Sequence, residues 1–350
     1  MAPMKERKAD HIDICVNEKV TQDHCYWDDI KLIHEALPEL NAGDVDMSAT
    51  VLGKKLEFPF IVTAITGGFS GAEKINANIA KACGELGVGM GAGSQRAAVE
   101  KIDEKSYSVI KKYDVPLVIG NIGAPQLVPQ KKKKAFGDAD IEKAMELIGA
   151  DVMAVHLNFL QEMTQPEGDT NAAGCFDAIR GLARRYPVIV KETGAGISSK
   201  TAKRLSGIGV RGIDIAGMGG TSFSAVEMHR AIAKNDNVRA SVGKTFFDWG
   251  IPSPVSLMTL DADIPAIASG GIMNGLHVAV SIALGACCAG AAGIILKDAM
   301  TSSDAVKKRL IAIREELRTA MMLTGSANLA ELASADRIIT GRTKEWMDQI

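Results

Sequence analysis

The chain has few aromatic residues, no Cys-x-x-Cys pair and no excess of either charge. Aromatics make up 5% of 350 residues, six cysteines are scattered along the chain, and the formal net charge is −2. We expect reduced, mostly buried thiols in a cytoplasmic protein. The charge balance gives no electrostatic reason to bind nucleic acid or an anionic membrane.

A long uninterrupted hydrophobic run is also missing. Residues 277–296 come closest, but Gly285, Gly290 and Gly293 interrupt them, so we predict no membrane span. No basic-then-apolar segment opens the sequence, which favours a cytoplasmic protein. The one basic run, residues 131–134, precedes a predicted turn and is interpreted as a solvated loop.

Short apolar runs alternate with amphipathic helical patterns from about residue 58 onward. This series of eight strand–helix units predicts a (β/α)8 TIM barrel. A doubly wound open sheet is the alternative, but such sheets usually have fewer strands. The predicted helices include residues 72–86, 199–206 and 303–323. The predicted strands are residues 60–65, 88–91, 116–121, 151–157, 188–192, 212–216, 264–268 and 288–296.

The two ends of the chain stand outside this alternation. We expect residues 1–57 to form an N-terminal arm that contributes to the substrate site, residues 58–323 to form the barrel, and residues 324–350 to form a C-terminal helical tail. The connection at about residues 235–263 is long for a compact barrel, and we interpret it as a lid. A packed surface loop is the alternative.

Each predicted strand is followed by polar or glycine-rich residues. Ligands of parallel α/β proteins bind at the carboxyl ends of the strands, so a shared ligand at the barrel mouth would explain this uniformity. The fourth strand end is the most informative, because His156, Asn158, Gln161 and Glu162 follow a buried-looking run there. A solvated loop is the alternative.

Two glycine-rich strand ends indicate a phosphate site. Gly270-Gly271 precedes a predicted helix, and Gly290-Ala291-Ala292-Gly293 follows the next strand. Small residues let backbone N–H groups approach a phosphate, and the loops after strands seven and eight are the usual phosphate site of such barrels. Ordinary left-handed turns are the alternative.

Three further features indicate an anionic ligand. Lys191 ends an apolar strand, where an unpaired ammonium group would be costly to bury. A carboxylate such as Glu162 would hold Mg²⁺ beside a substrate phosphate, unless it is a solvated loop residue. Arg7, Lys8 and His11 would bind a diphosphate if the N-terminal arm folds over the barrel mouth; otherwise they are solvent-exposed.

Together these segments resemble the type 2 isopentenyl diphosphate isomerases, the FMN-dependent enzymes of isoprenoid synthesis. The resemblance covers nearly the whole chain, and the order and spacing of its motifs are specific. The family often has Arg where this chain has Met273, and it commonly has Arg or Leu followed by Pro where this chain has Gly293 and Ile294. The motifs are residues 7–11, 66–68, 93–96, 121–124, 156–162, 191–196, 219–222, 269–272 and 340–346.

The resemblance implies a site for each ligand. Catalysis is expected from Gln161, Lys191, His156 and Asn158. Mg²⁺ is expected at Glu162. The implied substrate-binding residues are Arg7, Lys8, His11, Ser94, Gln95, Arg96 and Gln161. The implied FMN-binding residues are Thr66, Gly67, Gly68, Ser94, Asn121, Lys191 and Thr221, with Gly270, Gly271, Ala291 and Ala292 at the phosphate.

The reaction that the resemblance implies is a 1,3-allylic proton shift between isopentenyl and dimethylallyl diphosphate. It needs reduced FMN, so NAD(P)H or another reductant is expected. Family members are homo-oligomers, so a homotetramer or homo-octamer is expected. An FMN-dependent 2-hydroxy-acid oxidase or dehydrogenase is an alternative, but it would need a His base at a strand end, and His229 and His277 lie in predicted helices. A non-catalytic flavin-binding barrel is a further alternative.

Overall fold

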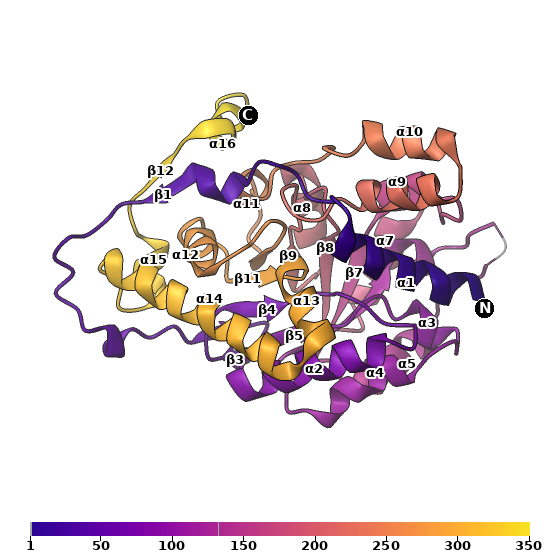
Figure 1. The fold of residues 1–350 in the computed structure, drawn as a ribbon, viewed down its shortest axis with the longest axis horizontal. Coiled ribbons are helices and arrows are strands. Elements are labelled where there is room, and N and C mark those ends of the chain that lie inside the picture. Colours follow the sequence, from indigo (N-terminus) through magenta and orange to yellow (C-terminus); the bar gives the residue numbers. More distant parts are fainter. Residues whose placement is uncertain (1, 132) are drawn as a thin grey trace.

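Eight parallel strands close into a barrel in the computed structural model, which describes residues 2–131 and 133–350. Lys132 of the basic run lies outside the described residues. The prediction of a (β/α)8 barrel is confirmed, with helices surrounding the strands (Figure 1). The strands are β4 (Phe60–Val62), β5 (Gly89–Gly91), β6 (Val118–Gly123), β7 (Val152–Leu157), β8 (Val188–Glu192), β9 (Gly212–Asp214), β10 (Ala266–Ala268) and β11 (Cys288–Ala291).

Every strand overlaps the apolar run that predicts it, but β4 and β9 end before the predicted Ile65 and Ala216, and the eighth strand is also shorter than expected. The prediction that it extends to Leu296 is wrong, because β11 ends at Ala291 and α13 (Gly293–Thr301) begins two residues later. The strand register places His156, Lys191 and Asp214 side by side on β7, β8 and β9. Residues in register on parallel strands face the same side of the sheet, so these three groups are neighbours.

The longer helices follow the strands and pack outside the barrel. Most of them bury one apolar face against the strands, whereas the helix at residues 275–283 is buried on nearly all sides. These helices are α2 (Ala72–Leu86), α5 (Asp138–Ile148), α7 (Cys175–Ala183), α8 (Ser199–Ser206), α9 (Phe223–Ala233), α12 (Gly275–Ala283) and α14 (Ser303–Leu323). Shorter helical segments are α3 (Arg96–Val99), α4 (Lys105–Ser108), α6 (Phe159–Thr164), η2 (Ala42–Asp44), η3 (Val109–Lys112) and η4 (Ala124–Leu127).

A separate apolar cluster fills the inside of the barrel. Side chains from the strands, such as Ile61, Ile119 and Ile189, pack there against Val51 and Leu56. The last two belong to a hairpin of the N-terminal extension, formed by β2 (Ala49–Val51) and β3 (Lys54–Leu56). The hairpin therefore closes the end of the barrel interior opposite the ligand-binding ends of the strands.

The connection at residues 235–263 differs from the expected lid. It contains α10 (Asn237–Thr245) and α11 (Ser253–Met258). α10 packs on α9, and no residue of 235–263 lines the main cavity. The segment is therefore a connection of two packed helices, and the lid interpretation is wrong.

Part of the N-terminal extension pairs with the C-terminal tail on one side of the barrel. β1 (Ile30–Leu32) pairs antiparallel with β12 (Arg337–Ile339), and the two strands lie side by side at the upper left of Figure 1. The tail is thus part strand, with α15 (Leu329–Ala333) and α16 (Gly341–Met347) on either side of β12. At the other end, α1 (Ala2–Asn17) packs on α9. Among the described residues, no helix combines the length and hydropathy needed to cross a bilayer.

Candidate active site

A cavity of about 570 Å³ opens at the carboxyl ends of the barrel strands, within the size range of small-molecule sites. It brings together the N-terminal arm, the polar end of β7 and the glycine-rich ends of β10 and β11. The predicted residues that line it are Arg7, Lys8, His11, Thr66, Ser94, Arg96, Asn121, His156, Asn158, Gln161, Glu162, Lys191, Thr221, Gly270, Gly271, Ala291 and Ala292.

Three residues predicted at the site do not line the cavity. The Gln95 side chain is fully buried, where its Nε2 donates to the Ala144 carbonyl and its Oε1 accepts from the Asn121 N–H. Gly67 and Gly68 leave room for neighbouring side chains, because a Cβ on Gly67 would overlap the Tyr107 ring and one on Gly68 would press on Ala97. Their position is structural support beneath the site.

His156 is held as a neutral imidazole. Burial and the positive charges of Lys191 and Lys8 lower the pKa of His156 to about 3. Its Nδ1 lies 2.8 Å from the Asn121 Oδ1, and the Asn121 Nδ2 donates to the Ala92 carbonyl. Because the amide orientation makes that Oδ1 an acceptor, His156 Nδ1 carries the proton. His156 Nε2 is left as a hydrogen-bond acceptor.

The Gln161 side chain has a fixed orientation at the start of α6. Asn158 Nδ2 donates to its Oε1 at 3.2 Å, and its Nε2 donates to Glu227 Oε1 at 3.4 Å. Glu227 comes from α9, is fully buried, and also pairs with His11 at 2.8 Å and Arg230 at 2.6 Å. These pairings lower the pKa of Glu227 although burial opposes ionisation. Glu227 therefore carries charge and joins the arm to the Gln161 amide.

The surroundings of Glu162 offer oxygen atoms to a hard cation. Its carboxylate accepts from Asn158 Nδ2 at 2.9 Å and from the Asp169 N–H at 2.7 Å, and burial raises its pKa. Asn158 Oδ1 and Gln165 Oε1 are buried nearby without a hydrogen-bond partner among the described residues. A carboxylate beside two unpartnered amide oxygens fits Mg²⁺, which prefers oxygen ligands and retains several waters.

The arm brings positive charge to the cavity wall. Lys8 Nζ donates to the Ser94 carbonyl at 2.9 Å and to Tyr107 Oη at 3.0 Å, and burial lowers its pKa to about 7. Arg7 lines the cavity with its Nε buried and unpartnered in the described part of the chain. These donors suit an anion. By contrast, Arg96 is already paired with Asp169 at 2.6 Å and with Glu100 at 2.8 Å.

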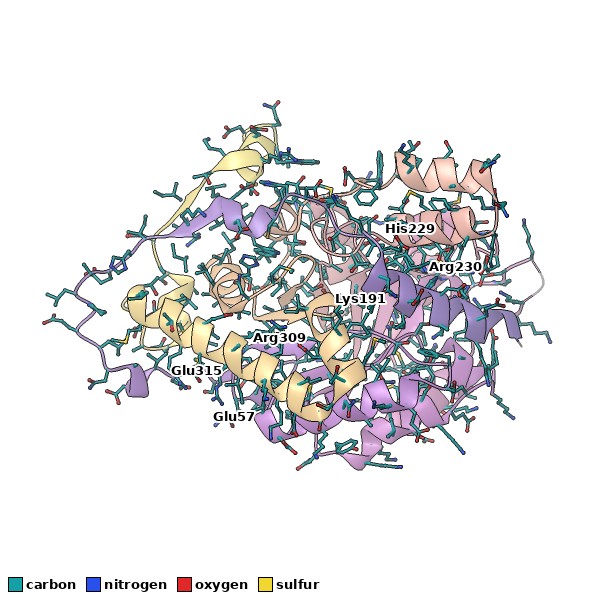
Figure 2. The ribbon with its side chains drawn as sticks, in the orientation of Figure 1. Glu57, Lys191, His229, Arg230, Arg309 and Glu315 are labelled. Carbon is teal, nitrogen blue, oxygen red and sulfur yellow. The ribbon has the colours of Figure 1, made fainter. Side chains whose placement is uncertain are left out.

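Lys191 lies among the barrel strands at the centre of the molecule, and Arg230 lies on α9 near α1 (Figure 2). Lys191 Nζ donates to the Glu192 carbonyl at 2.5 Å. The Glu192 carboxylate accepts from the N–H groups of Thr193 and Gly194 at 2.6 and 2.7 Å. Glu192 is thus occupied by the backbone, and the Lys191 charge is available to the cavity.

The two glycine-rich ends form adjacent walls of the cavity. Gly270 and Gly271 have φ values of +87° and +80°, which favour glycine. Gly293 and Ile294 open α13, where the first N–H groups of a helix lack intrahelical partners. Both walls suit the phosphate of FMN. Met273, at one position where the chain departs from the family pattern, also lines the cavity.

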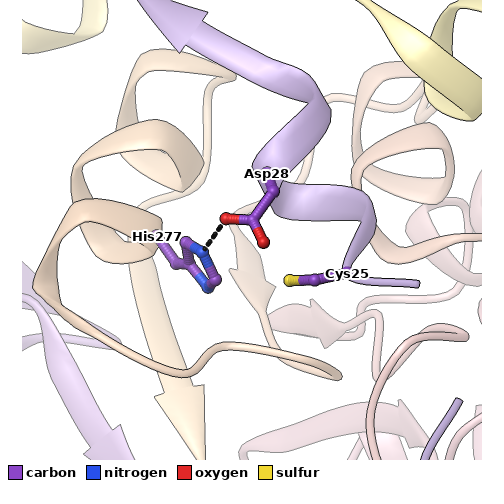
Figure 3. Close-up of side chains that lie close together, drawn as sticks. All are labelled: Cys25, Asp28 and His277. Atoms are coloured by element: carbon purple, nitrogen blue, oxygen red, sulfur yellow. Dashed lines mark hydrogen bonds and ion pairs between the residues drawn. The ribbon is translucent and has the colours of Figure 1, made fainter. Parts of the chain in front are cut away.

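Cys25, Asp28 and His277 form a group whose potential ligand atoms lie within 4.8 Å of one another (Figure 3). The hydrogen bonds oppose a metal ion there. His277 Nδ1 accepts from the Met273 N–H at 3.2 Å, so the neutral ring carries its proton on Nε2, which lies 2.9 Å from Asp28 Oδ1. A metal on Nε2 would require the opposite tautomer.

Several cavity residues were missed by sequence reasoning. Gln165 follows Gln161 by four residues, and this helical spacing would have indicated a shared face. Phe223 carries no local signal, because it reaches the cavity only through the packing of α9. Glu227 carries none either, because it lies behind the cavity wall, where it contacts His11 and Gln161. Residues 21–25 line it because the extension returns across the barrel, where Thr21 bridges to Thr221.

The fold and the site define the class of protein as a flavin-type barrel. Residues 150–339 match the model of the FMN-dependent dehydrogenase family. A mandelate oxidase variant shares the fold with a TM-score of 0.62 at 16% identity, covering 97% of this chain and 99% of that one. A flavocytochrome b2 variant with sulfite bound has a TM-score of 0.62 at 17% identity, covering 92% of this chain and 81% of that one.

Curated relatives of similar length identify the family within this class. The isopentenyl-diphosphate delta-isomerase of Thermoplasma acidophilum is 47% identical over 344 residues, 98% of this chain and 99% of the relative. That of Archaeoglobus fulgidus is 43% identical over 349 residues, 98% of each chain. The chain belongs to the isopentenyl-diphosphate delta-isomerase family, in its type 2, FMN-dependent form.

Proposed function

We propose that the protein interconverts isopentenyl and dimethylallyl diphosphate by a 1,3-allylic proton shift that requires reduced FMN. The observation that carries this proposal is the single cavity that joins the basic arm to the polar end of β7 and the glycine-rich ends of β10 and β11. Full-length identity of 47% to an isopentenyl-diphosphate delta-isomerase supports the same activity.

FMN would lie across the cavity floor, with its phosphate near Gly270, Gly271 and the start of α13. When bound and reduced, the flavin supplies an electron-rich ring that stabilises positive charge developing on the alkene. Lys191 would stabilise the negative charge of the reduced ring electrostatically. Thr66, Ser94, Asn121 and Thr221 would contact the ring and its side chain.

The residues of β7 and α6 would orient the substrate alkene beside the flavin ring, which would supply and remove the proton when bound and reduced. Gln161 would position the reacting carbons, since its amide is fixed by Asn158 and Glu227. A carboxamide is an implausible base at neutral pH, so Gln161 would orient or relay rather than abstract a proton. Neutral His156 would present Nε2 as an acceptor.

The diphosphate would be held between the arm and a metal ion. Arg7, Lys8 and His11 would bind its oxygens, and Mg²⁺ at Glu162 would neutralise further charge. Fixing the diphosphate in this way converts binding energy into orientation of the remote double bond. NAD(P)H as reductant and a homotetrameric or homo-octameric assembly complete the proposal.

Oxidation of a 2-hydroxy acid is the alternative suggested by the shared fold. The mandelate oxidase and flavocytochrome b2 variants are only 16–17% identical to this chain, so they show the fold alone. His229 and His277 lie in α9 and α12, as the sequence predicts, and not at strand ends. That chemistry would need a histidine beside a substrate-clamping arginine at a late strand end. The described residues contain no such pair.

An anaerobic assay tests the proposal. Protein, FMN, Mg²⁺ and isopentenyl diphosphate are combined in D₂O with either NADPH or dithionite as reductant, and product is followed by mass spectrometry. We expect deuterated dimethylallyl diphosphate only when the flavin is reduced. Absence of both product and deuterium exchange, or robust lactate or glycolate oxidation in air, would contradict the assignment. Light scattering of the same sample tests the assembly.

A further inference from the structure

The turn at Gly270 and Gly271 is held from outside the cavity by η1 (Tyr26–Asp29). The Trp27 indole is 1% exposed, and its Nε1 donates to the Gly270 carbonyl at 2.8 Å. Ser253 Oγ donates to the same carbonyl at 2.7 Å. Both lone pairs of this oxygen are thus engaged by side chains, which fixes the direction of the peptide unit.

The orientation of this peptide unit decides where its N–H points. In a planar trans peptide the N–H is directed opposite to the C=O, so anchoring the Gly270 carbonyl aims the Gly271 N–H the other way. Within residues 2–131 and 133–350, the N–H groups of Gly271 and Ile272 have no protein acceptor, and both residues line the cavity. Unpartnered N–H groups at a cavity wall require an acceptor such as an anion.

A second connection reaches the far end of the same turn. Asp28 Oδ1 lies 2.9 Å from His277 Nε2, and His277 Nδ1 accepts the Met273 N–H at 3.2 Å (Figure 3). These two hydrogen bonds connect η1 to both the loop and the first turn of α12. The Cys25–Asp28–His277 group is therefore part of the support of the turn.

The C-terminal tail in turn holds η1. The buried Asp29 carboxylate accepts from both the N–H and the Oγ1 of Thr343, each at 2.9 Å. Thr340 Oγ1 donates to the Asp29 carbonyl at 2.8 Å, and Ile30 pairs with Ile339. Residues more than 300 positions apart thus form one unit beneath the turn.

We propose that residues 25–29 and 340–343 form a clasp that sets the affinity of the Gly270–Gly271 turn for a phosphomonoester, the phosphate end of FMN. The inference rests on the proposed FMN site and adds that Trp27 and Thr343 are positioning residues for the cofactor. Their effect is specific to the phosphate, because the clasp acts on the turn and not on the wall that would face the flavin ring.

The test compares FMN with riboflavin, which lacks the phosphate, by flavin fluorescence titration of the full-length apoprotein. Trp27→Phe keeps the aromatic packing but frees the Gly270 carbonyl, so the Gly271 N–H is no longer pre-organised toward the phosphate and the FMN Kd should rise about 5-fold. The riboflavin Kd should not change. Thr343→Val, which loosens η1 from the tail, should shift the FMN-to-riboflavin ratio in the same direction.

Trp249→Phe is the matched control, because Trp249 is 63% exposed and does not line the cavity. Unchanged FMN affinity in both clasp variants would overturn the clasp, and so would an equal loss for FMN and riboflavin, which indicates general damage. A wild-type protein that binds neither flavin would instead overturn the proposed function, so the two failures are distinguishable.

Discussion

The charged residues of the site differ in how freely each could respond to a ligand. Lys8 is half-buried and donates to uncharged oxygens, whereas Arg96 is committed to Asp169 and Glu100. A cation without a carboxylate partner gains most from an incoming anion. Lys8 should therefore contribute more to diphosphate binding than Arg96.

The lowered pKa of Lys8 predicts that kcat/KM for the diphosphate substrate depends on pH. Its lowered pKa of about 7 means that it is charged below pH 7 and neutral above it. If only the charged form captures the diphosphate, kcat/KM should fall about 10-fold between pH 6 and pH 8. Lys8→Arg keeps its charge throughout this range and should flatten that limb. Superimposable profiles for Lys8→Arg and wild type would contradict the role of Lys8.

If Glu162 binds Mg²⁺, replacing it should change the metal requirement of the activity without changing flavin binding. Glu162→Gln removes the negative charge but keeps the shape, so the Mg²⁺ concentration for half-maximal activity should rise at least about 10-fold. The FMN Kd from fluorescence titration should stay the same. Glu146→Gln, on the exposed face of α5, is the control and should alter neither quantity. An unchanged Mg²⁺ requirement in Glu162→Gln would remove the metal assignment.

At the scale of elements, we expect the hairpin β2–β3 to contribute to the stability of the fold but not to its activity. Leu56 is fully buried inside the barrel, far along the strands from the cavity. Leu56→Ala should lower the free energy of unfolding in urea by about 2–5 kcal/mol. Leu37→Ala, at a side chain 74% exposed, should change it by less than about 0.5 kcal/mol. Both variants should retain wild-type kcat at temperatures where they are folded.

Regular elements were predictable where the local pattern was unambiguous. The predicted bounds of α2, α8, α14 and β8 agree with the structure. The end of β11 was not predictable, because residues 288–296 are apolar throughout and periodicity cannot separate a buried strand from the first turn of a buried helix. β12 was missed because three residues form a strand only by pairing with β1, more than 300 residues away.

The candidate site shows the same division between local and non-local information. The polar end of β7 identified its residues because charged and amide groups after an apolar run are conspicuous in sequence. Neighbours such as Ser94 and Gln95 were not distinguishable, since only the fold decides which of the two faces the cavity. Glu227 was invisible because its partners, His11 and Gln161, lie 216 and 66 residues away.

At the scale of the whole molecule, the arm and the barrel have separable tasks. A chain beginning at Glu18 lacks Arg7, Lys8 and His11 but keeps both glycine-rich walls. Hydrogen bonds to charged groups are worth about 1.5–3 kcal/mol each, so kcat/KM should fall at least about 100-fold. The FMN Kd should be retained, with circular dichroism melting as the control for folding. A truncated protein with wild-type kcat/KM would exclude the arm from the substrate site.

The pairing of Ile30 with Ile339 also constrains the order of assembly. Thr340 and Thr343, which secure η1, lie more than 300 residues after it and are made after all eight barrel strands. A nascent chain can close its barrel before then, but it cannot complete the support beneath Gly270. Tight FMN binding should consequently follow the synthesis of residues 337–343, and ribosome-stalled chains that end before residue 337 should bind FMN more weakly than the full chain.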